Sequence, residues 1–273
     1  MWNEIPEDIK EPSALVYGLD NEKYHAMPGL SKSGIDHLQR SPAHYQAWKQ
    51  TPQVETLAMK LGSLIHCAVL EPECFHERYY VGSNHDKRTT VGKANAAAEA
   101  KDAGERILIS MDEDDMANNI MLAVVNHPIA SQLLDGGHAE VSVFAELDGV
   151  ECRCRPDYLI DSLIIDVKST DDAGPGFINS VSKYNYHIQS SFYLDVCKAA
   201  GLDVDHFLFL AVEKKAPWCV ALYELDEDSI VLGRWEYKQC LEVYKQCLET
   251  GVWPGYSEDI KTLRLPNYML KDL

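Results

Sequence analysis

The chain has 273 residues, of which 46% are hydrophobic, and this is enough to bury the core of one large domain. Its formal net charge of -18 argues against a protein that coats nucleic acid nonspecifically, because such binding depends on neutralising phosphates with lysine and arginine. The charge does not exclude a nuclease, since metal-binding carboxylates add to the negative count and a few basic residues can line a DNA path.

No window of the sequence approaches the roughly 20 apolar residues that a membrane helix needs. The opening residues, MWNEIPEDIKEPS, have neither the basic nor the apolar region of a secretory signal. We therefore expect a cytoplasmic protein with no membrane partner. Its eight cysteines include no CxxC pair, so we expect ordinary thiols and neither zinc nor iron-sulfur ligation.

The N-terminal part, about residues 31–134, has the spacing of apolar residues that is typical of amphipathic helices. Pro42 divides a pair of short helices. The polar stretch 81–106, rich in Ala, Lys and Asp, predicts a mobile loop that runs into a helix, with Lys87 and Arg88 at its exposed start. The other helices predicted in this part are two within 31–49, one at 54–70 and one at 112–134.

From residue 140 onward, apolar and polar residues alternate as in strands, and Asp148-Gly149 is a strong hairpin turn signal. The first three strands predict a meander. The sequence thus indicates an α/β fold with a mixed central β-sheet flanked by helices, in a single domain over residues 1–273. The predicted strands are 140–147, 151–160, 163–168, 206–213 and 218–225, which make a sheet-bearing core at about 140–225 with one internal helix at 181–200 and a closing helix at 227–249.

Three ionisable residues of this core indicate chemistry. Asp157 lies near the end of one strand, and Asp166 and Lys168 stand two residues apart on the next, so that both project from one face. Charges in the otherwise apolar segment LIIDVK need a purpose, because burying unpaired charges is costly. Phosphodiester cleavage supplies one: the carboxylates hold Mg²⁺, and the lysine orients or deprotonates the attacking water.

A purely structural interpretation of the same residues is also open. Asp166 and Lys168 can form a salt bridge on an edge strand, with Asp157 a turn residue after Pro156. The D-x-K pattern alone does not decide between the two interpretations. The Pro156-Asp157 pair one strand earlier, across a tight turn, favours the nuclease.

Four short motifs stand in a fixed order along the chain: Gly62 with His66, Arg155-Pro156-Asp157, Asp166-Val167-Lys168, and Gln189 with Tyr193. In order and spacing they resemble the RecE (exodeoxyribonuclease VIII) family of the RecB-like PD-(D/E)XK nuclease superfamily. The segment SKSGIDHLQRSPAHY is also similar to the opening helices of that family. The resemblance covers residues 31–225 and implies a restriction-endonuclease-like core.

The resemblance also assigns roles to these motifs. The implied metal ligands are His66, Asp157, Asp166 and the carbonyl of Val167, and the implied catalytic set is Asp157, Asp166, Lys168, Gln189 and Tyr193, of which the last two position the lysine and the DNA backbone. His66 stands one helical turn after Gly62, where a glycine allows close backbone approach. Glu140, at the start of the first strand, is a further candidate for the acidic cluster.

Several side chains near the motifs are candidates for DNA contact, with solvated surface as the alternative for each. Two arginines alternate on the strand that carries Asp157, and a Ser-Thr pair follows Lys168. The segment Ser31-Lys32-Ser33 at a predicted helix start can bind a terminal 5′-phosphate through backbone amides and the helix dipole. The candidates are Arg153, Arg155, Ser169, Thr170, Ser31 and Ser33.

The activity that the resemblance implies is a Mg²⁺-dependent double-strand DNA exonuclease, in which Mn²⁺ can substitute. It would degrade one strand 5′→3′ and leave 3′ tails for recombination by single-strand annealing. Members of the family form rings that enclose DNA ends, so we expect a homo-oligomeric ring and a RecT-like annealing partner. Such genes are often carried by phages, in which case the protein would act in the host cytoplasm.

Three alternatives remain. A Cas4-like nuclease of the same fold needs clustered C-terminal cysteines for its iron-sulfur cluster, and Cys240 and Cys247 have no third thiol nearby. An endonuclease can be built on the same site. A catalytically silent DNA-binding or assembly module is disfavoured, because such a scaffold has no need to keep His66 and Lys168 together with the aspartates.

Overall fold

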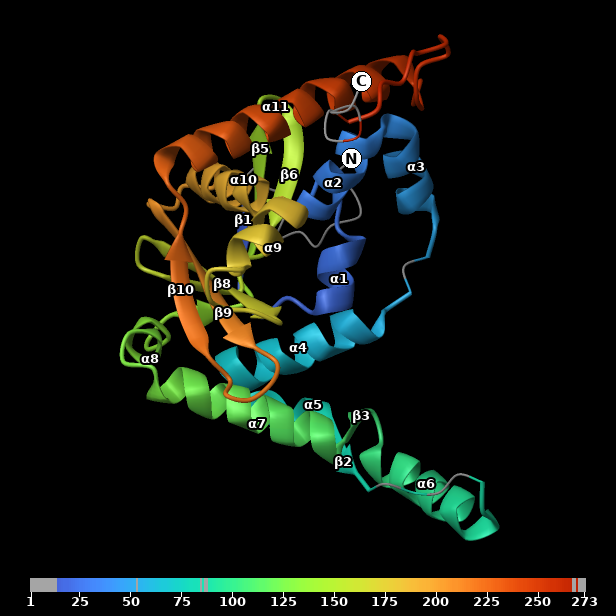
Figure 1. Ribbon diagram of the computed structural model, residues 1–273, viewed down its shortest axis with the longest axis vertical. Helices are drawn as coiled ribbons and strands as arrows, with labels where there is room; N and C mark the ends of the chain where they lie inside the picture. Colours follow the sequence, from blue (N-terminus) through green and yellow to red (C-terminus); the bar gives the residue numbers. More distant parts are fainter. Residues whose placement is uncertain (1–13, 53, 84, 86–87, 267–268, 270–273) are drawn as a thin grey trace.

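The computed structural model describes residues 14–52, 54–83, 85, 88–266 and 269 (Figure 1). A mixed five-stranded sheet lies at the centre, in the order β10-β9-β8-β7-β4. Strands β8 and β9 run parallel, and the other neighbours run antiparallel. The α/β class expected from the sequence is confirmed. The strands are β4 (His138–Ala139), β7 (Tyr158–Ile160), β8 (Leu163–Thr170), β9 (His206–Glu213) and β10 (Val220–Glu224).

Strand β8 is central because it is apolar toward both layers of helices. Ile164 joins the core under α10 (Tyr186–Ala199), whereas Ile165 and Val167 join the core formed with α4 (Leu57–Leu70) and α7 (Met111–Asn126). Alternate residues of a strand face opposite sides of the sheet. The side chains at positions 166 and 168 therefore lie on the α10 side.

A second, antiparallel sheet of three strands packs against α10: β1 (Ala14–Val16), β5 (Ser142–Leu147) and β6 (Val150–Cys154). The predicted three-stranded meander is therefore wrong, since β6 and β7 belong to different sheets. The chain changes sheets over residues 155–157, where Pro156 lacks the amide hydrogen that a sheet ladder requires.

Helices cover both faces of the central sheet, with α10 backed by α11 on one side and α4 with α7 on the other (Figure 1). The pair predicted within 31–49 is α2 (Lys32–Arg40) and α3 (Pro42–Gln50). None of the helices that the structure describes combines the length and the apolar character that crossing a bilayer demands. The remaining helices are α1 (Asn21–Ala26), η3 (Pro72–Cys74), α5 (Phe75–Arg78), α6 (Thr90–Ala103), α8 (Ala130–Leu133), α9 (Phe177–Lys183) and α11 (Glu227–Thr250).

Two of the helices predicted as continuous are broken. The stretch 112–134 is divided into α7 and α8 at His127-Pro128, because proline cannot continue a helix ladder. The stretch 181–200 is divided into α9 and α10 at Asn185, whose φ of +53° is left-handed. The second break brings the residues between α9 and α10 to the edge of the candidate site.

An arm extends from the body of the molecule (Figure 1). It consists of β2 (Tyr79–Gly82), α6 and β3 (Ile107–Ser110), with β2 and β3 paired in parallel. This strand pair is not predicted from the sequence, because each strand is only four residues long. The helix predicted within 81–106 is α6, and Lys87 lies outside the described residues.

Candidate active site

The D-x-K pair of β8 lies on the α10 side of the sheet, as the two-residue spacing requires. The carboxylate of Asp166 is only 1% exposed, and its Oδ1 accepts a hydrogen bond of 2.5 Å from Gln189 Nε2. Its other oxygen forms an ion pair with Lys168 Nζ. The lysine ammonium also lies 4.6 Å from the centre of the Tyr186 ring. Asp166 is thus held from two sides, and it holds Lys168 in turn.

Asp157 comes to the same place from the segment between the two sheets. Its Oδ2 accepts a hydrogen bond of 2.8 Å from the backbone amide of Val167, between the two residues of the D-x-K pair. This bond ties the carboxylate to the centre of β8. The aspartates of both motifs therefore lie next to each other although they are nine positions apart in the sequence.

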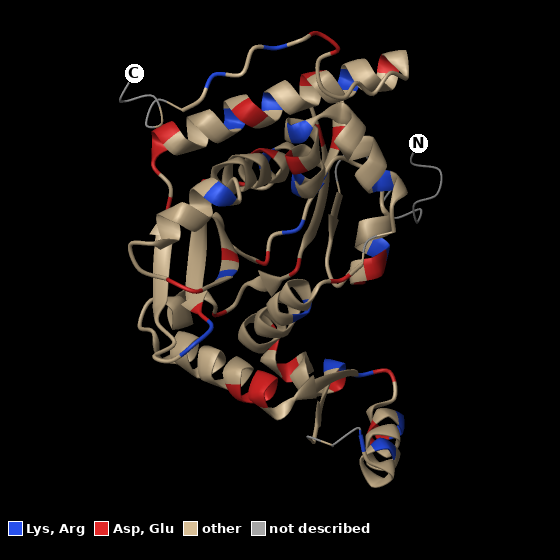
Figure 2. Ribbon diagram, turned by 45° about the vertical axis from the view of Figure 1, so that its right-hand side comes forward, with Lys and Arg blue, Asp and Glu red and all other residues tan. Residues whose placement is uncertain are grey.

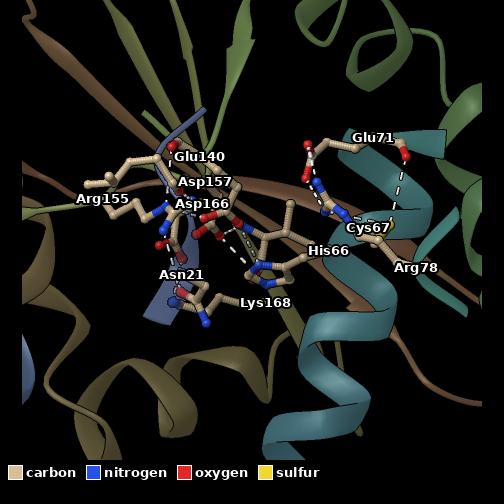
Figure 3. Close-up of polar contacts among 12 residues, drawn as sticks. Asn21, His66, Cys67, Glu71, Arg78, Glu140, Arg155, Asp157, Asp166 and Lys168 are labelled. Carbon is tan, nitrogen blue, oxygen red and sulfur yellow. Dashed lines mark hydrogen bonds and ion pairs between the residues drawn. The ribbon is translucent and has the colours of Figure 1, made fainter. Parts of the chain in front are cut away.

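His66 reaches the same cluster from α4, on the opposite layer of the fold (Figure 3). Its Nε2 lies 2.9 Å from the carbonyl oxygen of Val167 and 3.6 Å from Asp157 Oδ2. The neighbouring Gly62 has a different surrounding from the one expected, because a Cβ there would meet no atom within 4 Å. Close packing of the protein against Gly62 is thus not the reason for a glycine at this position.

Glu140 completes the cluster and is fixed by an arginine. Its Oε1 lies 3.8 Å from His66 Nδ1, and its Oε2 forms an ion pair of 2.9 Å with Arg155 Nε. The backbone of Glu140 is left-handed, with φ of +53°, a conformation that non-glycine residues rarely adopt. Its amide donates to the carbonyl oxygen of Asp157. Glu140 thus adopts a strained backbone conformation, and its carboxylate lies beside His66.

The donor set of this cluster suits a divalent cation. One ligand atom from each of His66, Glu140 and Asp157 lies within 4.8 Å of the others, with the Val167 carbonyl beside them. Carboxylate and carbonyl oxygens are the ligands of Mg²⁺, and Mn²⁺ also accepts an imidazole. The residues present therefore fit the implied metal. Within the described residues no cysteine belongs to a metal-holding group, and all eight cysteines are free.

Burial shifts the pKa values of Asp166, Asp157 and His66. It raises the pKa of Asp166 to about 6, with Asp157 adding to the shift and Lys168 opposing it. It also raises the pKa of Asp157, against the effect of His66. For His66 burial acts in the opposite direction, but Asp157 and Glu140 outweigh it and raise the pKa to about 9. Such mutually shifted groups in one place are typical of functional sites.

The two residues of the Q-x-x-x-Y motif have different surroundings. Gln189 is buried and contacts Asp166 directly. Tyr193 packs its ring edge-on against Phe207, with centroids 6.1 Å apart, and lines the same polar cavity as Gln189 and Lys168. Both residues therefore border the cluster from α10, and Gln189 is the one that touches it.

The arginines predicted to contact DNA are engaged inside the protein. Arg153 is only 7% exposed and donates to the carbonyl oxygens of Tyr24 and Met27, so it is not available to a phosphate. This expectation is corrected by the structure. Arg155, besides pairing with Glu140, donates to the carbonyl oxygen of Leu19 at 2.8 Å. Arg155 is therefore held by contacts within the protein, beside the candidate metal ligand Glu140.

The hydroxyl candidates are divided between internal bonds and the site. Thr170 is buried and donates to the carbonyl oxygen of Asp172, and Ser31 Oγ caps α2 by accepting from the Gly34 amide. Both hydroxyl groups therefore make hydrogen bonds within the protein. Ser33 lines the cavity beside Lys168, and Ser169, directly after that lysine, is half-buried.

A mixed sheet whose central strand carries D-x-K, with a second aspartate fixed to that strand, defines the PD-(D/E)XK class. The sequence model of a family described as "PDDEXK-like domain of unknown function (DUF3799)" matches residues 31–266, and the chain belongs to that family. This family establishes the superfamily expected from the motifs but does not single out the RecE branch, which stays a prediction.

One solved structure has a similar fold. A crystal structure titled "Putative exonuclease" from Eubacterium rectale matches with a TM-score of 0.57 at 13% identity, over 93% of this chain and 98% of the other. A second structure, titled SSO0001, matches with a TM-score of only 0.28 at 18% identity, over 68% of this chain and 87% of that one, and carries no argument. No curated protein matches the chain.

Proposed function

We propose that this protein is a metal-dependent DNA nuclease. The observation that carries the proposal is the convergence of Asp157, Asp166 and Lys168 with His66 and Glu140 at one buried place. The finer proposal is a double-strand exonuclease that acts 5′→3′ and leaves 3′ tails for recombination by single-strand annealing. The polarity, the DNA end as substrate and the recombination role are supported by the resemblance to RecE.

Each residue of the cluster has a stated part in this proposal. Asp157, Glu140 and His66, with the Val167 carbonyl and Asp166, would hold the metal. A bound divalent cation supplies an activated water and neutralises charge on the phosphate. Asp166 aims the Lys168 ammonium, which donates hydrogen bonds to the attacking water or to a phosphate oxygen.

The proposed partners follow from charge and from the resemblance. A chain with a net charge of -18 gains little from general attraction to DNA. A homo-oligomeric ring around a double-stranded DNA end would keep the enzyme on its substrate by topology instead. We propose such a ring, together with a RecT-like single-strand annealing protein that receives the 3′ tail.

The test uses the purified protein and three DNA forms. Linear duplexes with 5′-phosphate or 5′-hydroxyl ends and a covalently closed circle are incubated with Mg²⁺, with Mn²⁺ or with EDTA. We expect metal-dependent loss of the linear DNA from its ends, with circles spared. Nicked circles would show that the protein is an endonuclease with the same site. The absence of hydrolysis under every condition would indicate a catalytically silent DNA-binding module.

A further inference from the structure

A polar cavity of about 480 Å³ opens next to the candidate active site. One wall is the start of α2, with Lys32 and Ser33, and the other is the segment that joins α9 to α10. Lys168 and Gln189 belong both to this cavity and to the cluster described above. Whatever occupies the cavity therefore reaches the catalytic lysine directly.

The two aromatic rings of the joining segment each lie against a lysine ammonium, one from Lys183 at the end of α9 and one from Lys168 of β8. The rings of Tyr184 and Tyr186 are stacked, with centroids 5.7 Å apart and an interplanar angle of 27°. Lys183 Nζ lies 5.0 Å from the centre of the Tyr184 ring, and Lys168 Nζ lies over the Tyr186 ring. Tyr184 is 49% exposed, although an aromatic side chain of this size gains from burial. An exposed, stacked tyrosine in a basic cavity is a surface suited to a nucleobase.

The joining segment is held in place from α2. Lys32 Nζ donates to the carbonyl oxygen of Tyr184 at 2.7 Å, and Asn185 Nδ2 donates to Gln39 Oε1 at 2.9 Å. The left-handed backbone of Asn185 sets the turn between the two helices. The tyrosine pair is thus fixed before any ligand arrives, which lowers the entropic cost of binding.

We propose that this cavity binds one unpaired nucleotide of the strand to be cut, with its base stacked on Tyr184 and its phosphate directed to Lys168. The proposal rests on the proposed nuclease function and specifies its substrate as a locally unpaired strand. An exposed cation-π contact is weak, so a base displaces Lys183 from the tyrosine face at little cost. The freed ammonium then meets the phosphate, and in the described part of the chain Lys183 has no carboxylate partner to hold it back.

Stacking recognises the flat face that every base shares, so the cavity is expected to accept all four bases. The other polar groups of the cavity fit a sugar-phosphate. Lys32 keeps its ion pair of 2.8 Å with Asp36 and supports the wall, and the exposed Ser33 side chain lines the cavity where it can meet the backbone of the strand. A base inside the duplex is stacked on both of its faces, so it must leave the stack before it can lie on Tyr184.

The experiment is a cycle of two changes, one in the protein and one in the DNA. Fluorescence anisotropy, with EDTA to prevent cutting, measures the binding of a short labelled oligothymidylate and of the same strand with abasic residues at its 5′ end. For the native protein we expect base removal to weaken binding by roughly 5- to 150-fold, the range of one stacked base. In Tyr184→Ala the two strands should bind equally, and Tyr184→Phe, which keeps the ring, should behave as the native protein does.

Tyr256→Ala is the matched control, because Tyr256 is an exposed tyrosine outside the cavity and should leave the base dependence intact. Circular dichroism checks that each variant is folded. If base removal has no effect on the native protein, or the same effect in Tyr184→Ala, the stacking site is wrong. If the native protein cleaves DNA but its binding does not depend on the base through Tyr184, only the stacking site is wrong. If binding depends on the base through Tyr184 but no DNA is cleaved, only the nuclease function is wrong.

Discussion

Arg155 shows at the scale of one residue how the fold changes what a motif residue does. Its sequence position beside Asp157 indicates a DNA contact, but the guanidinium is bound to Glu140 and to the carbonyl oxygen of Leu19. It also lies 5.3 Å from the centre of the Tyr24 ring. Each of the three nitrogens of its guanidinium makes a hydrogen bond within the protein. We infer that Arg155 is a positioning residue for Glu140.

Arg155→Lys is therefore expected to weaken metal binding. A lysine keeps the charge but lacks the planar fork that bonds two acceptors at once. The loss of a partner that orients a metal ligand typically costs about 10- to 100-fold in metal affinity. The metal concentration for half-maximal cleavage should rise by about that factor, with the maximal rate recovered at high Mg²⁺. Arg40→Lys, at an exposed arginine of α2, is the control. If Arg155→Lys leaves the metal requirement unchanged and weakens DNA binding, then Arg155 contacts DNA and does not position Glu140.

Lys168→Ala tests the chemical assignment itself. We expect cleavage to fall by at least about 100-fold, the usual contribution of a positioned proton-transfer or charge-stabilising group. Folding should be largely retained, because the ammonium faces the cavity and contributes little to core packing, and any loss of DNA binding should be much smaller than the loss of cleavage. Lys238→Ala, at an exposed ion pair with Asp148, is the matched control. Normal cutting by Lys168→Ala would show that the site is elsewhere.

The sequence predicted those residues whose neighbours are local. Asp166 and Lys168 share a face because they are two apart in one strand, and no distant contact is needed to see it. Arg153 was misplaced because its partners, Tyr24 and Met27, lie more than 120 residues away in the chain. From the sequence Glu140 is only a further candidate for the same reason, since the fold alone brings it to His66.

The junction between α9 and α10 determines the shape of the cavity at the scale of elements. A continuous helix over 181–200 would carry Tyr184 and Tyr186 around the helix axis, about 200° apart, and they would not stack. The left-handed turn at Asn185 ends one helix and starts the next, so that both rings line one cavity. Asparagine is one of the few residues that adopt this conformation readily.

Asn185→Ala should destabilise the protein by about 1–2 kcal/mol relative to Asn185→Gly, because a left-handed backbone is unfavourable for alanine and not for glycine. Both variants lose the hydrogen bond to Gln39, so the difference between them isolates the backbone term. Urea unfolding measures both free energies. If Asn185→Ala is as stable as Asn185→Gly, then the turn is not strained and the helix break has another cause.

The sequence predicts a helix or strand correctly where one pattern of apolar residues runs through the whole element. It fails where the pattern continues across a change of hydrogen-bonded partner. Strand β9 matches its predicted range because HFLFLAVE is apolar throughout. The strand predicted at 151–160 was divided, because alternation continues across Pro156 while the hydrogen-bonded partner changes from β5 to β8. Alternation shows that a segment is extended and cannot show which neighbour it pairs with.

At the scale of the whole molecule, the candidate site joins layers that are far apart in the sequence. His66 comes from α4 on one face of the central sheet, and Gln189 comes from α10 on the other. Acidic residues outnumber basic ones along the chain, as in the first turn of α7, and lysines and arginines are scattered between them (Figure 2). A cation is thus drawn to the molecule, and DNA must be captured by a localised site.

Metal binding is expected to stabilise the entire fold, because the ligands come together only in the native chain. An ion that binds the native state alone adds about 2.7 kcal/mol at 100 times its dissociation constant. For domains of 150–250 residues each kcal/mol raises Tm by about 2–4 °C, so Mn²⁺ or Mg²⁺ should raise Tm by about 5–11 °C over the value in EDTA. Differential scanning calorimetry at increasing metal concentration measures this shift.

Asp157→Asn separates this site from general binding of cations to an acidic surface. The amide oxygen can still accept from Val167, so the local fold is kept while the charge of the ligand is lost. The metal-induced rise in Tm should disappear in this variant. It should persist in Asp205→Asn, whose carboxylate is exposed at the start of β9 and pairs with Lys198. An equal rise in both variants would mean that the ion binds elsewhere, since the diffuse negative charge of the chain is almost the same in each.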